Sequence, residues 1–320
     1  MVLNDISRLI AQELKIKEQQ VNATIDLLDS GNTIPFISRY RKEVTGELTE
    51  EHIRHIEERT QYLRNLVKRQ EEILASIEEQ GKLTPELTSA IEKSIKLQEL
   101  EDIYLPFRPK KRTRASIAKE KGLEPLAELI LAQDNANNLE AIATDFINAD
   151  LEVNSLEDAI NGAMDIIAEI VSDNGSYRGV IRKCTYDKGQ IKSTVVKGKE
   201  AENPELEMYF DHTEAIKTIK DHRILALNRG EKKKALSVKL VAPSEEIETY
   251  LKKELVKAQP SSYLLKAIAD SYTRLIAPAI EREIRTALKE RAEEGAIKMF
   301  ALNLKKLLRR DGTIQPRSAK

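Results

Sequence analysis

Two histidines, His52 and His55, lie three residues apart in the segment EEHIRHIEE, and on a helix their imidazoles could face one metal ion. The segment lacks the HExxH order in which zinc hydrolases combine two histidine ligands with a catalytic glutamate. Charged residues fill both sides of the segment, which is typical of a solvated helix surface. We therefore expect no metal site.

Nucleophilic and acid–base chemistry has no stronger support in the sequence. The single cysteine, Cys184, has no CxxC companion, and His212 and His222 stand outside any motif that pairs a histidine with a nucleophile. The carboxylates alternate with Lys and Arg at helical spacings, which surface ion pairs explain. The segment VVKGKE lacks the GxxxxGK[ST] pattern of a phosphate-binding loop. We therefore expect no enzyme and no cofactor.

The densest basic segment is YLPFRPKKRTRASIAKEKG, in which Pro106 and Pro109 interrupt the helical pattern. Arg and Lys side chains held in such a strip could follow a phosphate backbone, with the rings of Tyr104 and Phe107 nearby. In the alternative interpretation, the two rings anchor the loop in the core and the cations face water or acidic helices. The candidate nucleic-acid-binding residues of this strip are Arg108, Lys110, Lys111, Arg112 and Arg114.

A second basic cluster lies in the segment DHRILALNRGEKKKAL, beside an expected turn at Gly230. Its cations could also meet phosphates. The alternative is a charged turn that leads into the strand after Lys234. The candidate residues of this cluster are Arg223, Arg229, Lys232 and Lys233.

Composition indicates what kind of scaffold positions these segments. Of the 320 residues, 41% are hydrophobic, 33% are charged and only 4% are aromatic, which favours long solvated helices around a sizeable core. The formal net charge is -1, so any nucleic-acid surface must be local. One cysteine, no apolar leader and no stretch of roughly 20 apolar residues predict a cytoplasmic protein without membrane insertion.

Helical periodicity predicts a mainly α fold, a multi-helix array with one long helix. Short helices before Gly46 resemble a helix-turn-helix unit, a pattern that three-helix packings without ligands share. Thr49 can cap a spine helix that runs to about Gln80. The residues that we expect this spine helix to bury include Ile56, Leu63 and Leu66.

A small β element interrupts the helices around residues 190–241, where the segments IKSTVVK and ALSVKLV have the alternation of strands. Helical patterns return at Ser244, with Pro278 kinking or dividing the last long helix. The predicted divisions are a helix-turn-helix-like unit at 1–46, a helical domain with the spine helix and basic loop at 47–184, a small mixed α/β element at 185–242, long C-terminal helices at 243–308 and a disordered tail at 309–320.

Four long stretches resemble the Tex family of bacterial transcription accessory proteins: IPFISRYRKEVTGELTE, ELEDIYLPFRPKKRTRASIAKEKGLEPLA, DHRILALNRGEKKKALSVKL and DSYTRLIAPAIEREIRTALKERAEEGAI. They occur in the order expected of the family's amino-terminal region and extend over residues 5–308. The resemblance implies a cytoplasmic, nucleic-acid-associated protein that acts in or around transcription. Tex proteins usually continue with an RNase H-like YqgF domain, helix-hairpin-helix elements and an S1 domain. We therefore expect this chain to be truncated before the YqgF domain.

Two functions are consistent with these features. The first is a helical platform that binds RNA or DNA without sequence preference during transcription. The alternative is a non-catalytic scaffold that docks other domains or RNA polymerase and does not itself bind nucleic acid.

Overall fold

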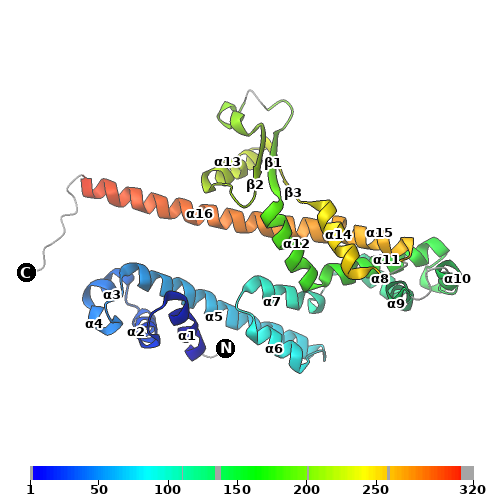
Figure 1. Ribbon diagram of the computed structural model, residues 1–320, viewed down its shortest axis with the longest axis horizontal. Helices are drawn as coiled ribbons and strands as arrows, with labels where there is room; N and C mark the ends of the chain where they lie inside the picture. The colour runs from blue at the N-terminus through cyan, green and yellow to red at the C-terminus, as the bar shows by residue number, and fades with distance from the viewer. Residues whose placement is uncertain (1–2, 110, 134–137, 200–201, 258–259, 311–320) are drawn as a thin grey trace, which may run out of the picture. The chain divides into compact units, whose positions relative to one another are not determined.

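The computed structural model describes residues 3–109, 111–133, 138–199, 202–257 and 260–310 (Figure 1). The described residues form helices and one small three-stranded sheet, so the predicted mainly α fold with a small β element is confirmed. The chain divides into two compact units, residues 1–108 (unit 1) and residues 109–320 (unit 2). The finer divisions predicted at residues 46, 184 and 242 stay predictions.

Unit 1 is organised around one long helix, α5, which begins after Thr49 and ends before Gly81. The Thr49 hydroxyl accepts a hydrogen bond from the backbone amide of His52, 3.3 Å away, and so caps the first turn. Gly81 has a φ of +66°, the left-handed conformation that ends helices. The helices of unit 1 are α1 (Leu3–Leu14), α2 (Glu18–Asp29), α3 (Ile34–Tyr40), α4 (Lys42–Thr45), α5 (Glu50–Glu79), α6 (Pro85–Lys93), α7 (Leu97–Tyr104) and the 3-10 turn η1 (Leu105–Phe107).

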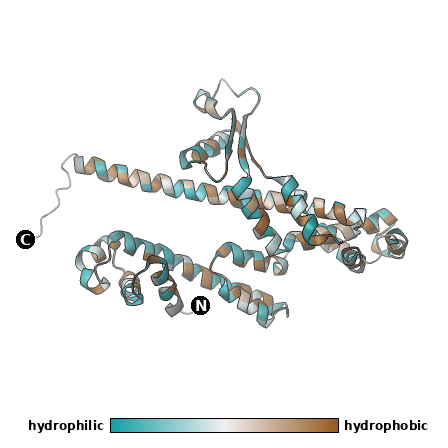
Figure 2. Ribbon diagram, in the orientation of Figure 1, coloured by the Kyte–Doolittle hydropathy of each residue, from teal (hydrophilic) through white to brown (hydrophobic). Residues whose placement is uncertain are grey.

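The spine helix α5 carries apolar residues along its full length (Figure 2). The predicted core residues are confirmed, because Ile56 and Leu63 are 0% exposed and Leu66 is 1% exposed. Helices α1, α2, α3, α6 and α7 pack against it. Burial of each such side chain stabilises the fold by about 1.5–3 kcal/mol, so tertiary packing holds this helix more than its propensity does.

Unit 2 packs its helices around α11, whose Ala163, Ile166 and Ile167 are fully buried. Gly162 lets Leu123 approach, since a Cβ at this position would lie only 2.4 Å from the Leu123 Cδ1 atom. The helical elements of unit 2 are α8 (Arg114–Glu120), α9 (Glu124–Ala132), α10 (Leu139–Thr144), η2 (Ala149–Leu151), α11 (Leu156–Asp173), α12 (Gly175–Lys188), η3 (Pro204–Tyr209), α13 (Asp221–Lys232), α14 (Ser244–Leu255), α15 (Ser262–Asp270), the π-helical turn η4 (Ser271–Ile276) and α16 (Ala277–Arg310).

The sheet of unit 2 is antiparallel, with the strand order β2–β1–β3. Strands β1 (Gln190–Val195) and β3 (Leu236–Val241) are those predicted by alternation, and Ile191 of β1 lies opposite Leu240 of β3. The edge strand β2 (Asp211–Ala215) was not predicted, because Asp, Glu and Ala are poor strand formers. Pairing with β1 gives this segment its strand structure.

The last helices form one continuous rod, in which η4 joins α15 to α16 just before Pro278. Pro278 lacks the amide hydrogen that would bond to the carbonyl of Arg274, four residues earlier, which accounts for the wide turn there. Helix α16 continues to Arg310, two residues past the expected end, and the predicted tail from 311 onward lies outside the described residues. Along this rod one row of buried side chains recurs every four positions, with Ala267 and Ser271 buried beside it: Leu264, Ile268, Tyr272, Ile276, Ile280, Ile284, Leu288 and Ala292.

Candidate nucleic-acid interface

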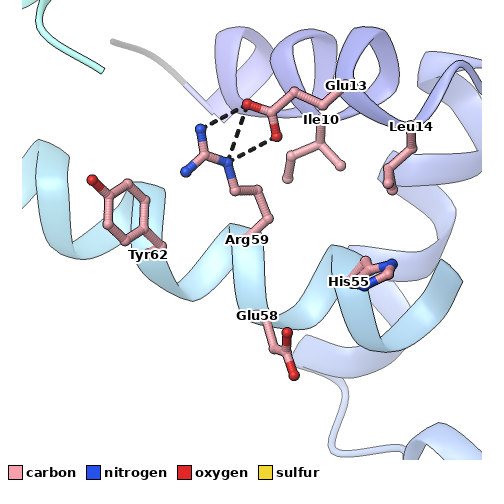
Figure 3. Close-up of a pocket in the computed structure, with 7 residues that line it drawn as sticks. All are labelled: Ile10, Glu13, Leu14, His55, Glu58, Arg59 and Tyr62. Carbon is pink, nitrogen blue, oxygen red and sulfur yellow. Dashed lines mark hydrogen bonds and ion pairs between the residues drawn. The ribbon is translucent and has the colours of Figure 1, made fainter. Parts of the chain in front are cut away.

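The two histidines of α5, His52 and His55, lie in different surroundings. The His52 Nδ1 atom lies 3.0 Å from the Thr49 hydroxyl oxygen, at the cap of the helix. His55 lines a pocket of about 320 Å³ between α1 and α5 (Figure 3). Among the described residues, no three His, Cys, Asp or Glu side chains gather in an arrangement that could hold a metal ion. Burial raises the pKa of the Cys184 thiol, which favours the protonated, less nucleophilic form at neutral pH.

Two of the polar groups that line this pocket, Arg59 and Glu13, are paired with each other. Figure 3 shows Arg59 reaching the Glu13 carboxylate, with its Nε and Nη2 atoms 2.9 and 2.7 Å from the two oxygens. The guanidinium of Arg59 also lies 4.8 Å from the centre of the Tyr62 ring. Because the Arg59 guanidinium forms a bidentate ion pair and also lies over a ring, Arg59 and Glu13 have little hydrogen-bonding capacity left for a ligand.

The basic strip after Pro106 is exposed where the structure describes it. Arg108 ends unit 1, whereas Lys111, Arg112 and Arg114 begin unit 2, and Lys110 lies outside the described residues. Arg108 and Lys111 make no ion pair with any residue that the structure describes. Arg112 lies 3.6 Å from Glu120, but the two side chains are 74% and 63% exposed, so solvent weakens this pair.

The first turn of α8 presents Arg114 to solvent. The Thr113 hydroxyl accepts a hydrogen bond from the Ser116 amide at 3.0 Å, and the Ser116 hydroxyl accepts one from the Thr113 amide at 2.8 Å. This reciprocal cap fixes the start of the helix. Ala115 and Ala118 of this helix are buried in the core of unit 2, whereas Arg114 itself is exposed. Its cation attracts Asp165 and acts to lower the pKa of that carboxyl, although burial outweighs this effect.

The aromatic rings beside the strip belong to the core of unit 1. Tyr104 is only 7% exposed, and its hydroxyl lies 3.0 Å from the Ser76 hydroxyl. Phe107 packs against the same core, and its carbonyl accepts a hydrogen bond from the Gln80 amide group at 2.8 Å. Both rings therefore pack in the core of unit 1, as the interpretation with anchored rings expects, and Tyr104 leaves little surface for stacking bases.

The second basic cluster is partly neutralised by carboxylates. The Arg223 Nη1 atom lies 2.8 Å from Glu214, and the Lys233 Nζ atom lies 2.7 Å from Glu205. Burial alone would raise the pKa of Glu214, but hydrogen bonds from Arg223 and His212 bring it below its usual value. The hydrogen bond from Lys233 likewise lowers the pKa of Glu205.

The other two cations of this cluster, Arg229 and Lys232, are exposed and make no ion pair within the described ranges. The prediction of a turn at Gly230 is wrong, because Gly230 lies inside α13. A Cβ there would lie 2.4 Å from the Leu236 Cδ1 atom, so this glycine permits close packing of α13 on β3.

A third cationic region, in α3 and α4, was missed by the sequence reasoning. Phe36 and Tyr40 are 37% and 63% exposed, and their ring centres lie 5.4 Å apart. Arg39, Arg41 and Lys42, which are close to these rings in sequence, are also exposed. The signal was the segment PFISRYRK, which places two rings four residues apart among three cations.

Comparisons with known proteins bear on the whole chain. A sequence model described as Tex-like protein N-terminal domain matches residues 4–78, and one described as Tex central region-like matches residues 134–300. The chain belongs to the Tex family. Since the two matches contain α1 to α5 and most of unit 2, both units of this Tex-family chain have counterparts in the family.

Three relatives illustrate the similarity. The chain is 47% identical to an uncharacterized Bacillus subtilis protein, YdcI, over 95% of this chain and 43% of that protein. It is 37% identical to the Transcriptional accessory protein Tex of Neisseria gonorrhoeae, over 95% of this chain and 41% of that protein. It is 27% identical to the human S1 RNA-binding domain-containing protein 1, over 95% of this chain and 32% of that protein. The chain therefore spans less than half the length of these relatives.

Proposed function

We propose that this chain is a nucleic-acid-binding platform of a cytoplasmic, Tex-like transcription accessory protein, and that it binds phosphates without sequence preference and without catalysis. One observation carries the proposal: the cations of the basic strip, including Arg108, Lys111 and Arg114, are exposed and lack close carboxylate partners among the described residues. Because the formal net charge is -1, a positive surface on this chain arises only from such a local excess of cations.

The energetics support a ligand for this strip. Cations close together in sequence repel one another, and without carboxylate partners they contribute little to folding. Phosphates of RNA or DNA would supply the missing negative charges and release bound counterions on contact. Contacts between these cations and phosphates do not depend on the base sequence, so the expected ligand is RNA or DNA of any sequence. The Neisseria relative is named a transcriptional accessory protein, which agrees with a role beside nucleic acid.

The two basic regions should contribute unequally to phosphate binding. In the cluster on α13, Arg229 and Lys232 are available for phosphates, whereas Arg223 and Lys233 already bind Glu214 and Glu205. A phosphate would have to displace those carboxylates, which reduces its net gain. We therefore expect the strip to contribute more than the α13 cluster.

The ion pairs of Arg223 with Glu214 and of Lys233 with Glu205 favour the second candidate function, a scaffold that does not itself bind nucleic acid. In a scaffold, cations complete internal pairs or meet a protein partner such as RNA polymerase, and nucleic-acid affinity is weak. None of the described helices has both the length and the apolar composition needed to cross a bilayer.

A salt titration separates the two functions. We expect affinity for a labelled 20-nucleotide RNA and for a 20-base-pair DNA to fall log-linearly between 50 and 200 mM salt. The triple variant Arg108→Ala, Lys111→Ala and Arg114→Ala should reduce the slope by about 2 to 3, because each phosphate contact contributes about 0.7 for single strands and 0.9 for duplexes. Its thermal midpoint should stay within roughly 2 °C of the parent, since exposed positions scarcely affect stability.

The matched control removes the same charge from lysines that already have acidic neighbours. Lys96, Lys199 and Lys252 lie 2.8, 2.7 and 3.6 Å from Glu99, Glu202 and Glu248, respectively. Changing these three to Ala should leave the slope nearly unaltered. Equal slopes for both triple variants and the parent, with earlier melting of the strip variant, would show that the strip serves internal partners and would overturn the proposal.

A further inference from the structure

The region of α3 and α4 combines exposed rings with unpaired cations, and we call it the α3 patch. It consists of Phe36, Arg39, Tyr40, Arg41 and Lys42. Phe36 and Tyr40 are four residues apart on α3, so their side chains share one face of the helix. Their rings are tilted by 44° with centres 5.4 Å apart. Tyr40, at 63% exposed, leaves most of its surface to solvent.

One cation of the α3 patch, Arg41, lies directly beside these rings. The Arg41 guanidinium carbon lies 5.4 Å from the centre of the Phe36 ring, and its Nη1 atom donates a hydrogen bond to the Tyr40 carbonyl at 3.3 Å. Arg39 and Lys42 are exposed. None of the three cations forms an ion pair in the part of the chain that the structure describes. Glu43 is exposed on α4 but does not neutralise them.

The backbone beneath the α3 patch is held firmly. Ile37, between the two rings in sequence, is 0% exposed and belongs to the core of unit 1. The Gln20 side chain of α2 donates hydrogen bonds to the carbonyls of Thr45 and Gly46, at 3.2 and 2.8 Å. Gly46 has a φ of +64°, and a Cβ there would lie 2.7 Å from the Gln20 amide nitrogen, so only glycine allows this contact. The rings therefore stand on a fixed surface.

Exposed rings and unpaired cations together select one class of ligand. A duplex offers phosphates, but its bases are already stacked on one another. A single strand offers both phosphates and free base faces, and each base that stacks on an aromatic side chain adds appreciably to affinity. A protein partner could cover the rings, but an acidic surface would be needed as well to satisfy three cations.

We propose that the α3 patch is a stacking site for unpaired bases of single-stranded nucleic acid, with Arg39, Arg41 and Lys42 on the flanking phosphates. The inference rests on the proposed function and adds a preference for single strands over duplexes. It assigns this preference to Tyr40 and Phe36, which lie outside both basic segments described above. Tyr40 supplies the more open ring face.

A tryptophan introduced at the patch gives a direct readout. The chain contains no Trp, so in Tyr40→Trp the emission at 295 nm excitation reports this position alone. We expect 12-nucleotide oligo-U to quench this emission as a base stacks on the indole, and a 12-base-pair duplex to leave it nearly unchanged. The matched control is Tyr186→Trp, at a ring of unit 2 that is 37% exposed and should report no stacking.

Affinity measurements on ring variants complete the test. Tyr40→Ala should weaken binding of oligo-U by roughly 5- to 150-fold while duplex affinity changes by less than about 2-fold, and Tyr40→Phe should restore the single-strand affinity. Circular dichroism should show the same helix content for all three proteins, because this ring is mostly exposed. Equal effects of Tyr40→Ala on both ligands, or no quenching in Tyr40→Trp, would overturn the stacking site.

The outcomes keep this inference separate from the proposed function. If the parent chain binds neither oligo-U nor duplex at 50 mM salt, the proposed function fails and the stacking site fails with it. If the parent binds both with a salt slope that the strip variant reduces, while Tyr40→Ala has no effect, only the stacking site fails. A lower single-strand affinity for Tyr40→Ala with an unchanged salt slope supports it, because the ring carries no charge.

Discussion

Two of the arginine–aromatic pairs of unit 1, Arg69 with Tyr104 and Arg41 with Phe36, differ in what surrounds them. Tyr104 lies in the core, 7% exposed, with the Arg69 guanidinium carbon 5.4 Å from its ring centre. Phe36 lies under Arg41 at the same 5.4 Å, but on an exposed helix face beside the open ring of Tyr40. The distance from the guanidinium carbon to the ring centre is thus the same in both places. Burial decides whether such a pair stabilises the fold or remains available to a ligand.

The partners of the two arginines show the same contrast. Arg69 lies 2.7 Å from Glu101 and 3.0 Å from Glu72, and its hydrogen bond to Glu101 raises the pKa of the guanidinium. Arg41 donates only to a neighbouring carbonyl among the described residues. An arginine with two carboxylates has little left to offer a phosphate, whereas Arg41 has most of its donors free.

The largest expected effect comes from removing the buried ring. Tyr104→Ala should lower the free energy of unfolding by about 3–5 kcal/mol, as other buried aromatic truncations do, because it leaves a cavity and an unpaired Ser76 hydroxyl. Urea denaturation followed by circular dichroism measures the loss. Tyr40→Ala is the matched control and should cost less than about 0.5 kcal/mol. Similar losses for the two variants would remove the basis of the comparison.

An intermediate effect is expected from the two arginines. Arg69→Met keeps the aliphatic bulk but leaves Glu101 without its partner, so it should cost about 1–3 kcal/mol. Arg41→Met should change stability by less than about 0.5 kcal/mol, since its contacts are exposed. In nucleic-acid titrations the order should reverse, with Arg41→Met lowering the salt slope and Arg69→Met leaving it unchanged. A lower slope for Arg69→Met would contradict the distinction drawn between the pairs.

The smallest effect is expected at Glu214, where a cation of the second basic cluster is already bound. The folded pKa of Glu214 is lowered, so the stability it contributes is present above its usual pKa of 4.5 and is lost as pH falls through the folded value. Glu214→Gln should therefore be less stable than the parent at pH 7 by about 1 kcal/mol or less, because solvent screens the partly exposed Arg223. Urea midpoints of the two proteins should converge between pH 5 and about pH 3. A difference that is independent of pH would argue against an ionic contribution.

Strong periodicity made most of the helical fold predictable. The capping residue Thr49, the spacing of Ile56 and Leu63, and the glycine that ends the spine helix each have a local cause that a sequence displays. Strand β2 had no such signal, because its structure depends on pairing with β1, which lies more than 15 residues earlier in the chain. Gly230 was misassigned because a glycine required by packing against Leu236 has the same local signature as a turn glycine.

The candidate interface was less predictable than the fold, for reasons visible in particular residues. The sequence shows that Arg223 is basic, but only the fold brings Glu214 to within 2.8 Å of it. The sequence shows that Tyr104 is near cations, but not that its hydroxyl forms a hydrogen bond with the hydroxyl of Ser76, 28 positions earlier. The density of charge drew attention to the strip after Pro106, whereas exposure of the rings distinguishes the α3 patch. Charge density can be read from sequence, and side-chain exposure requires the tertiary structure.

The four-residue spacing of buried side chains along α15, η4 and α16 has a geometric consequence for unit 2. Four residues advance an α-helix by about 400°, so each buried side chain in α16 is displaced by about 40° from the previous one. The buried stripe therefore winds around the rod, and the rod packs against α11 near its start and against α13 farther along. Deleting four residues near the start of α16 would shorten the rod by about 6 Å and would rotate the surface on which α13 packs by about 40° around the rod. The number of residues between the start of α16 and its contacts with α13, such as Arg291 with Asp221, thus sets the distance and the direction of the small β element from α11.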